Sequence, residues 1–291
     1  MQPVAAPVVG AHAPAAGGLA RSALPYVDAA GAAAVQVFVS NPRGWALSAG
    51  DPGQDEAFRD GCAQRSVPVF VHAPLLVNLG SPTAETVGRS AGAIAHGLRR
   101  GEQIGARAVV FHAGSAVNDG HLPVALRQLG DALRPLLDES AARGGPRLLV
   151  EPSAGGGRCL AARVEDLARY FEAVDWHPWL GVCFDTCHAF AAGHDVSTPD
   201  GMVATLDALT AAVGADRLAL VHANDSKDGC GSLRDRHENV GAGTIGAAAF
   251  AALLSHPATR GVPVIVETPS SGHAGHKADI ATLVRLSAVR R

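Results

Sequence analysis

Short apolar segments recur along the chain, and longer segments rich in Ala and Leu with helical spacing separate them. Apolar runs of this length predict strands, and the longer periodic segments predict helices. The pattern predicts eight strands: Val8–His12, Ala34–Ser40, Pro68–His72, Ala108–His112, Leu148–Glu151, Leu180–Asp185, Leu218–His222 and Val262–Glu267. The predicted helices include Thr83–Gly105, Pro123–Arg143, Val164–Ala173, Gly201–Val213, Ile245–Leu254 and Lys277–Leu286.

The alternation of strands and helices predicts an α/β fold with a parallel sheet that is buried on both faces. Dividing 291 residues among eight units leaves about 36 for each, which suits a strand, a helix and two loops. We therefore predict a single (β/α)₈ TIM barrel, a catalytic domain over residues 8–291 after a flexible tail over residues 1–7. A doubly wound open sheet is the alternative, but the segment after Val8–His12 lacks the glycine spacing of a dinucleotide-binding fingerprint.

Composition and charge narrow the possible partners and the compartment. Aromatic residues are only 4% of the chain, so aliphatic side chains must fill the core. The net charge of -3 argues against a broad basic surface, so any contact with nucleic acid must be local or depend on bound cations. The five cysteines form no CxxC pair, which predicts buried, reduced thiols. No apolar run is long enough to span a membrane and no signal peptide is recognisable, so we expect a cytoplasmic protein.

Residues that can bind metal stand at the ends of the predicted strands. Six of the strands end at such a residue, namely His72, His112, Glu151, Asp185, His222 and Glu267, and a seventh ends at His12. All strands of a parallel barrel end on one face, so these side chains should converge there. A lone histidine or carboxylate at such a position is more often structural. Burying three carboxylates together without counter-charge is costly, however, and divalent cations remove that cost.

The loops after two strands add three more candidates. His188 follows Asp185 by three residues, and Asp235 and His237 are two apart, which puts them on one side of an extended segment. Together they could form a metal site with open positions, although Asp235 could instead pair with Arg234 or Arg236 at the surface. Imidazole with carboxylate suits Zn²⁺ or Mn²⁺. Two or three metals fit nine ligands, and such clusters are common in phosphodiester cleavage.

Three longer motifs resemble those of the endonuclease IV family of apurinic/apyrimidinic (AP) endonucleases, also called deoxyribonuclease IV or AP endonuclease family 2. They are DTCHAFAAG over residues 185–193, HANDSK over residues 222–227 and DRHENVGAG over residues 235–243. Shorter matches, such as Gly10-Ala11-His12 and HAGS over residues 112–115, run in the family's order over nearly the whole chain.

The resemblance implies a DNA-repair enzyme with three zinc ions, one of them sometimes replaced by manganese. One metal would take His72, His112 and Glu151. A second would share Glu151 and add Asp185, His222 and Glu267, and the third would take His188, Asp235 and His237. The implied reaction is hydrolysis of the phosphodiester on the 5′ side of an abasic site, with Glu151 and Glu267 orienting or deprotonating the attacking hydroxide. It leaves a 3′-hydroxyl and a 5′-deoxyribose phosphate, and similar enzymes also trim blocked 3′ ends.

The same resemblance assigns contacts to double-stranded DNA. Arg43 matches a residue that penetrates the duplex, while Leu75 and Leu76 match an apolar wedge beside it. Lys227 and Arg236, with Arg234, are candidate phosphate contacts, although each could be an ordinary surface charge. The sequence departs from the family at Leu75, where an aromatic residue is usual, and at Ala242, where Glu is usual. We expect a monomer that acts at the nucleoid and does not bind membranes.

Two other functions are compatible with parts of this pattern. A sugar-phosphate isomerase or epimerase on the same barrel would use Glu151, Asp185, His222 and Glu267 around a single metal. It would not need the other five candidate ligands, which therefore favour the nuclease. A non-catalytic DNA-binding or metal-storage protein is the third possibility, and the complete set of carboxylates and histidines argues against it.

Overall fold

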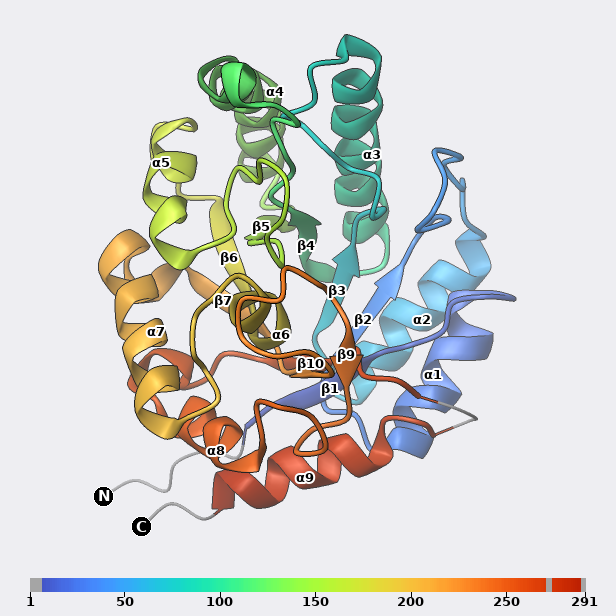
Figure 1. Ribbon diagram of the computed structural model, residues 1–291. Helices are drawn as coiled ribbons and strands as arrows, with labels where there is room; N and C mark the ends of the chain where they lie inside the picture. Colours follow the sequence, from blue (N-terminus) through green and yellow to red (C-terminus); the bar gives the residue numbers. More distant parts are fainter. Residues whose placement is uncertain (1–6, 271–273, 289–291) are drawn as a thin grey trace.

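Eight parallel strands close into a barrel in the order β1-β10-β7-β6-β5-β4-β3-β2 (Figure 1). The computed structural model describes residues 7–270 and 274–288. The barrel strands are β1 (Val9–His12), β2 (Val35–Phe38), β3 (Val69–His72), β4 (Ala106–His112), β5 (Arg147–Glu151), β6 (Leu180–Asp185), β7 (Leu218–His222) and β10 (Val264–Val266). All eight predicted strands are present, and the predicted TIM barrel is confirmed. Of the predicted tail over residues 1–7, residues 1–6 lie outside the described residues.

Helices surround the barrel and cover its outer face (Figure 1). They are α1 (Leu19–Ala30), α2 (Pro52–Gln64), α3 (Ala84–Gln103), α4 (Leu122–Ala142), α5 (Leu167–Glu172), α6 (Thr186–Ala191), α7 (Pro199–Val213), α8 (Ala247–Ser255) and α9 (Lys277–Ala288). The six predicted helices correspond to α3, α4, α5, α7, α8 and α9. The other three were not predicted. Helix α2 buries only four of its residues, so its apolar periodicity is weak. Two short strands, β8 (Asp225–Ser226) and β9 (His237–Glu238), pair antiparallel outside the barrel.

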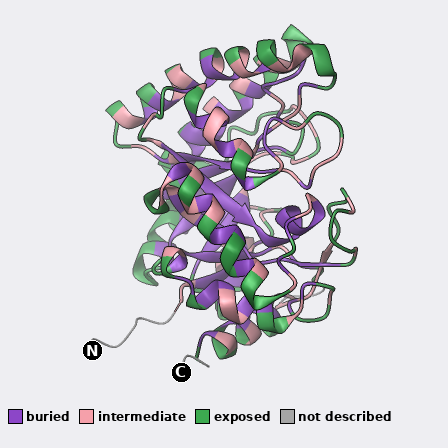
Figure 2. Cartoon of the chain, turned by 60° about the vertical axis from the view of Figure 1, so that its left-hand side comes forward, coloured by how far each residue is buried: buried purple, intermediate pink, exposed green. Residues whose placement is uncertain are grey.

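The inside of the barrel is divided into an apolar layer and a polar layer. Figure 2 shows the buried strands at the centre and the exposed outer faces of the helices. The apolar layer is made of Ala34, Phe70, Ala108, Val110, Leu149, Cys183, Leu220 and Ile265. Because strand side chains alternate between faces, residues two positions further along the strands also point inward. Those residues are Gln36, His72, His112, Glu151, Asp185, His222 and Glu267.

Strand β1 passes so close to β2 that only glycine fits at position 10. A Cβ atom added at Gly10 would lie 1.7 Å from the carbonyl oxygen of Ala34. Since that oxygen belongs to the backbone, the two strands would have to separate. We expect Gly10→Ala to lower the free energy of unfolding by about 3 kcal/mol in urea titrations.

The matched control is Gly88→Ala in α3, where an added Cβ meets nothing within 4 Å. That change should stabilise the protein by roughly 0.5–1 kcal/mol, because alanine restricts the unfolded chain more than glycine does. Equal effects of the two substitutions would show that the contact between β1 and β2 does not limit the residue at position 10.

Candidate metal centre

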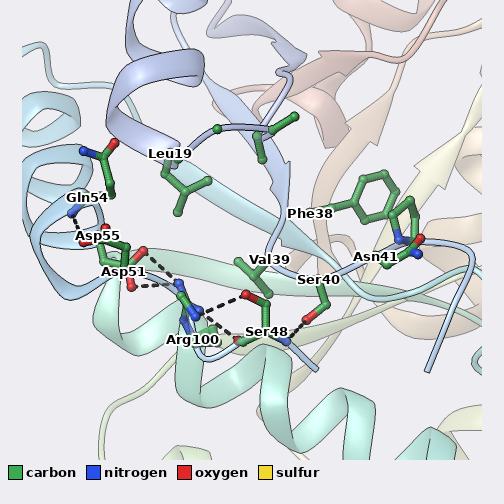
Figure 3. Close-up of a pocket in the computed structure, with 16 residues that line it drawn as sticks. Leu19, Phe38, Val39, Ser40, Asn41, Ser48, Asp51, Gln54, Asp55 and Arg100 are labelled. Carbon is green, nitrogen blue, oxygen red and sulfur yellow. Dashed lines mark hydrogen bonds and ion pairs between the residues drawn. The ribbon is translucent and has the colours of Figure 1, made fainter. Parts of the chain in front are cut away.

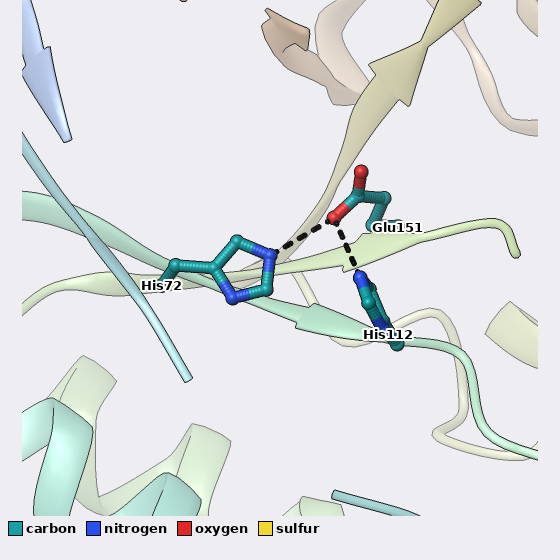
Figure 4. A group of neighbouring side chains, drawn as sticks. All are labelled: His72, His112 and Glu151. Carbon is teal, nitrogen blue, oxygen red and sulfur yellow. Dashed lines mark hydrogen bonds and ion pairs between the residues drawn. The ribbon is translucent and has the colours of Figure 1, made fainter. Parts of the chain in front are cut away.

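Glu151 lies at the middle of the polar layer and contacts four histidines. Its Oε2 is 3.3 Å from His72 Nε2 and 3.6 Å from His112 Nε2 (Figure 4). Its Oε1 is 3.0 Å from His222 Nδ1 and 3.4 Å from His188 Nδ1. The carboxylate therefore offers one oxygen to each of two groups of ligands, as a bridging residue would.

A second group forms around His222 at the ends of β6, β7 and β10. His222 Nδ1 lies 3.3 Å from Glu267 Oε2 and 3.9 Å from Asp185 Oδ2. With Glu151, these residues offer ligand atoms that all lie within 4.8 Å of one another. Strand β10 ends at Val266, so Glu267 is the first residue beyond the strand and not its last residue. Its amide is held in place because it donates to Asn224 Oδ1 over 2.8 Å.

The third group combines the first turn of α6 with the end of the loop between β8 and β9 and the first residue of β9. Asp235 reaches His188 Nε2 over 3.2 Å and His237 Nε2 over 2.9 Å. Asp185 lies 3.7 Å from His237 Nε2, which joins this group to the second. The alternative pairing of Asp235 with Arg234 or Arg236 is not what the structure shows. Both arginines approach Asp228 instead.

Backbone carbonyls orient three of the five histidines. The Nδ1 atoms of His72, His188 and His237 lie 2.7, 3.1 and 3.1 Å from the carbonyl oxygens of Ala73, Pro152 and Glu267. A carbonyl only accepts, so Nδ1 carries the proton and donates it. Each Nε2 then faces the carboxylates and becomes a metal ligand once it loses its proton, as in histidines that bind metals.

Opposite charges on the histidines and the carboxylates attract one another within the cluster. Burial raises the pKa of Glu151, but the charge and hydrogen bonds of His222 and His72 place it well below its ordinary value. Burial alone would lower the pKa of His237. The hydrogen bond and the charge of the neighbouring Asp235 outweigh burial and raise that pKa to about 9. The pKa of His112 falls to about 4 because burial outweighs the nearby carboxylates. Protons on part of the histidines thus provide the charge that balances the carboxylates.

The donor set fits divalent metal ions. In residues 7–270 and 274–288, no lysine or arginine lies within ion-pair distance of Glu151, Asp185 or Glu267. Divalent cations would compensate the same carboxylates and free the imidazole lone pairs by displacing protons. Nitrogen with oxygen ligands favours zinc or manganese over calcium. The residues that would hold the ions are the nine predicted ones.

Four residues that sequence analysis did not assign to the site lie directly against it. Gln36 contacts both Glu267 and His222, and Asn224 donates to Asp185 Oδ2 over 2.7 Å. Cys183 lies beside Glu151 and His222, and Cys187 beside Asp235 and His237. Burial raises the pKa of both thiols to about 12. Cys183 lies two residues before Asp185 on β6, so the period of two in that strand was the signal that could have found it. Strand β2 carries no predicted ligand, so no such signal marked Gln36.

Asp225 fastens the loop that carries Asp235 and His237. Its carboxylate is fully buried and accepts four backbone N–H groups, from Ser226 and Ile245 at Oδ1 and from Gly241 and Gly246 at Oδ2. An amide in its place would turn an N–H₂ group toward two N–H donors. We expect Asp225→Asn to lower the free energy of unfolding by about 3 kcal/mol and to speed proteolysis within residues 227–245.

Asp207→Asn makes the same chemical change at a carboxylate that is 68% exposed and bonded to His256. It should change stability by no more than about 0.5 kcal/mol. Equal rates of proteolysis for the wild type, Asp225→Asn and Asp207→Asn would contradict the role given to Asp225.

The predicted DNA contacts lie on two sides of the cluster. Arg43, Leu75 and Leu76 are exposed, and the Leu75 amide donates to the Pro42 carbonyl over 2.9 Å. That bond holds the loops after β2 and β3 side by side. Lys227 and Arg236 are exposed on the loop between β8 and β9 and lie beside Glu267 in one shallow pocket. Ala242, the other departure from the family, is exposed in the same loop region.

A pocket of about 590 Å³ lies under the loop that carries Arg43, between the start of α1 and the start of α2 (Figure 3). None of the nine predicted ligands lines it. At its edge, the buried Arg100 bonds Asp55 over 2.7 and 2.8 Å and donates to the carbonyl of Ser48 over 3.1 Å. This ion pair anchors the far end of the loop to α3.

In residues 7–270 and 274–288, none of the helices has both the length and the apolar character that a membrane span requires.

Comparisons with known proteins agree with this geometry. The sequence pattern of the xylose isomerase-like TIM barrel family matches residues 24–286. A probable endonuclease 4 of Streptomyces coelicolor is 56% identical over 96% of this chain and 94% of its own. Endonuclease IV from Thermus thermophilus superposes with a TM-score of 0.81 at 35% identity, covering 97% of this chain and 98% of its own. A 3-keto-D-glucoside 4-epimerase from E. coli, at 16% identity and a TM-score of 0.69, covers 97% of this chain and 99% of its own. It shares the fold.

Proposed function

This chain belongs to the endonuclease IV family, and we propose that it hydrolyses the phosphodiester bond on the 5′ side of abasic sites in double-stranded DNA. The observation that carries the proposal is the convergence of five histidines and four carboxylates at one end of the barrel. The substrate would be chromosomal DNA, so we place the enzyme in the cytoplasm, at the nucleoid. We further propose that it acts as a monomer.

We assign three zinc ions to the three groups, one of them replaceable by manganese. His72, His112 and Glu151 would hold one, and Glu151 with Asp185, His222 and Glu267 the second. His188, Asp235 and His237 would hold the third. When bound, such ions activate water and neutralise charge on a transferring phosphoryl group.

The chain's own carboxylates would orient and deprotonate the attacking water. Glu151 and Glu267 lie on either side of His222, with one oxygen of each within 3.3 Å of its Nδ1. A water between them would meet two acceptors and lose its proton to one of them as it attacks phosphorus. The products would be a 3′-hydroxyl and a 5′-deoxyribose phosphate. Blocked 3′ ends present the same kind of bond, so we include their trimming in the proposal.

Three loops would contact the duplex around the abasic site. Arg43, Leu75 and Leu76 are exposed on two loops that the bond between Leu75 and Pro42 holds together, which suits insertion between base pairs. Lys227 and Arg236, on the opposite side of the cluster, suit phosphate contacts. An abasic sugar has no base to unstack, so extruding it into the cluster costs less than flipping an intact nucleotide.

The third group of ligands disfavours the isomerase alternative. A single-metal isomerase needs the group around His222 alone, whereas His188, Asp235 and His237 form a further set. The likeness to the epimerase, at 16% identity, extends to the fold alone.

The test is incision of a duplex oligonucleotide with one abasic analogue, beside an undamaged duplex and with metal content measured on the same preparation. Cleavage on the 5′ side with near three metals per chain is expected, and His188→Ala should lose both one metal and the activity. His256→Ala, which removes a histidine bonded only to Asp207 and to the turn after α8, is the control. One metal and no cleavage would sink the endonuclease and favour the isomerase.

A further inference from the structure

Gln36 connects two of the predicted ligands through one neutral side chain. It is fully buried on β2 and points into the barrel. Its Nε2 lies 2.6 Å from Glu267 Oε1, and its Oε1 lies 3.0 Å from His222 Nε2. The amide does not titrate, so its own donor and acceptor are the same at every pH.

The chemistry of the partners determines which way the amide faces. An ionised carboxylate only accepts hydrogen bonds, so the NH₂ group must point to Glu267. The amide oxygen then faces His222 and accepts from its Nε2–H. With a proton held on Nε2, Nδ1 is the atom that can give up its proton and bind a metal, and it faces Glu151 and Glu267 over 3.0 and 3.3 Å.

His222 differs in this respect from the other oriented histidines. His72, His188 and His237 donate to backbone carbonyls and present Nε2 to the cluster. His222 presents Nδ1, and a side chain holds its other nitrogen. Among these four histidines of the described chain, only His222 has its second ring nitrogen bonded to a neutral side chain, which a substitution can remove, and not to a backbone carbonyl.

The same amide also separates the roles of the two oxygens of Glu267. Oε1 accepts from Gln36 and lies 3.1 Å from His12 Nδ1, whereas Oε2 faces His222. Gln36 Nε2 is 2.9 Å from the same His12 atom, so the three side chains form one network. With Oε1 occupied, Oε2 is the oxygen left for a metal or a water.

We propose that Gln36 is a positioning residue that selects the Nδ1 lone pair of His222 and the Oε2 atom of Glu267 as the ligand atoms of the second metal. The proposal rests on the metal centre proposed above and adds a residue to its supporting contacts. Partners of this kind commonly contribute 10–100-fold to metal affinity or activity. Gln36→Met keeps the length and volume of the side chain and removes both hydrogen bonds.

The test is competition for zinc between the protein and a chromogenic chelator, read as one dissociation constant per bound ion. Gln36→Met should raise the dissociation constant of one zinc ion by roughly 10–100-fold and leave the constants of the other ions unchanged. In incision assays at limiting zinc, kcat should fall by a similar factor while KM for DNA stays constant, and excess zinc should restore part of the loss. The side chain in Gln36→Asn is one carbon shorter and remains polar, so it should reach only one of the two partners. Its effect on the dissociation constant of the same ion should be smaller than that of Gln36→Met.

Gln128→Met is the matched control, because Gln128 also donates two hydrogen bonds, to the carbonyls of Leu79 and Ser81, but contacts no predicted ligand. Its zinc affinities should equal those of the wild type. Unchanged zinc affinity in both Gln36 variants would overturn the proposal while leaving the endonuclease intact. A wild-type protein that binds no zinc would overturn the metal centre itself, so the two failures are distinguishable.

Discussion

Replacing Glu151 by Gln is expected to lower kcat/KM for incision of an abasic duplex by about 10³-fold, equivalent to about 4 kcal/mol. The side chain is fully buried and its two oxygens face four histidines. An amide keeps the shape but removes the negative charge, and it offers one acceptor in place of two. The loss should appear in the rate constant for cleavage of the bound duplex, measured under single-turnover conditions. Metal analysis of the variant should show at least one ion fewer than in the wild type.

The control is Glu172→Gln, the same change at an exposed residue at the end of α5. Its kinetics should match the wild type. Binding of the abasic duplex, measured by fluorescence anisotropy in the absence of turnover, should be nearly unchanged for both variants, because the proposed duplex contacts lie in other loops. A Glu151→Gln enzyme with more than a tenth of the wild-type activity would refute a bridging role for this carboxylate.

Removal of metal by a chelator is expected to lower the melting temperature by roughly 6 °C for each site emptied. Metal that binds only the folded chain stabilises it by about 4 kcal/mol when its free concentration is 1,000 times the dissociation constant. With an unfolding entropy of about 2.1 cal/mol/K per residue, a chain of 291 residues shifts its melting temperature by about 1.6 °C for each kcal/mol. Calorimetry with and without chelator measures the change, and returning zinc should restore the original melting temperature.

His188→Ala separates this effect from a general action of the chelator. The variant lacks one ligand of the third group, so the shift caused by chelator should be smaller by about one site. A chelator that destabilises the wild type and His188→Ala equally would mean that the third group holds no metal.

The fold and the positions of six of the nine predicted ligands could be predicted because both depend on the regular spacing of short strands. A strand that is buried on both faces leaves a compact apolar run, and the position where the run stops marks the barrel mouth. His72, His112, Glu151, Asp185 and His222 are the last residues of their strands in the structure. Glu267 lies one residue past β10, a difference too small to move it out of the cluster.

The supporting contacts were beyond the reach of the sequence because they depend on distances between strands. Gln36 lies in the middle of an apolar run, and only the closed barrel brings it to Glu267, 231 positions away. Asp225 is next to a predicted ligand motif, but its four bonds need the loop after β8 to return to it. Helix α2 was missed for a different reason: its caps, Asp51 with Pro52, are clear, but its apolar face is short.

The pairing of the first strand with the last has a consequence for when the enzyme becomes active during synthesis. β1 pairs with β10, and His12 meets Glu267 from 255 positions away. At translation rates of about 5–20 residues per second, roughly 13–50 s separate the synthesis of these two residues. Throughout that interval β1 has one unpaired edge, and the second group of ligands lacks its last carboxylate. A growing chain therefore cannot complete the second group of ligands before β10 has been translated and has paired with β1.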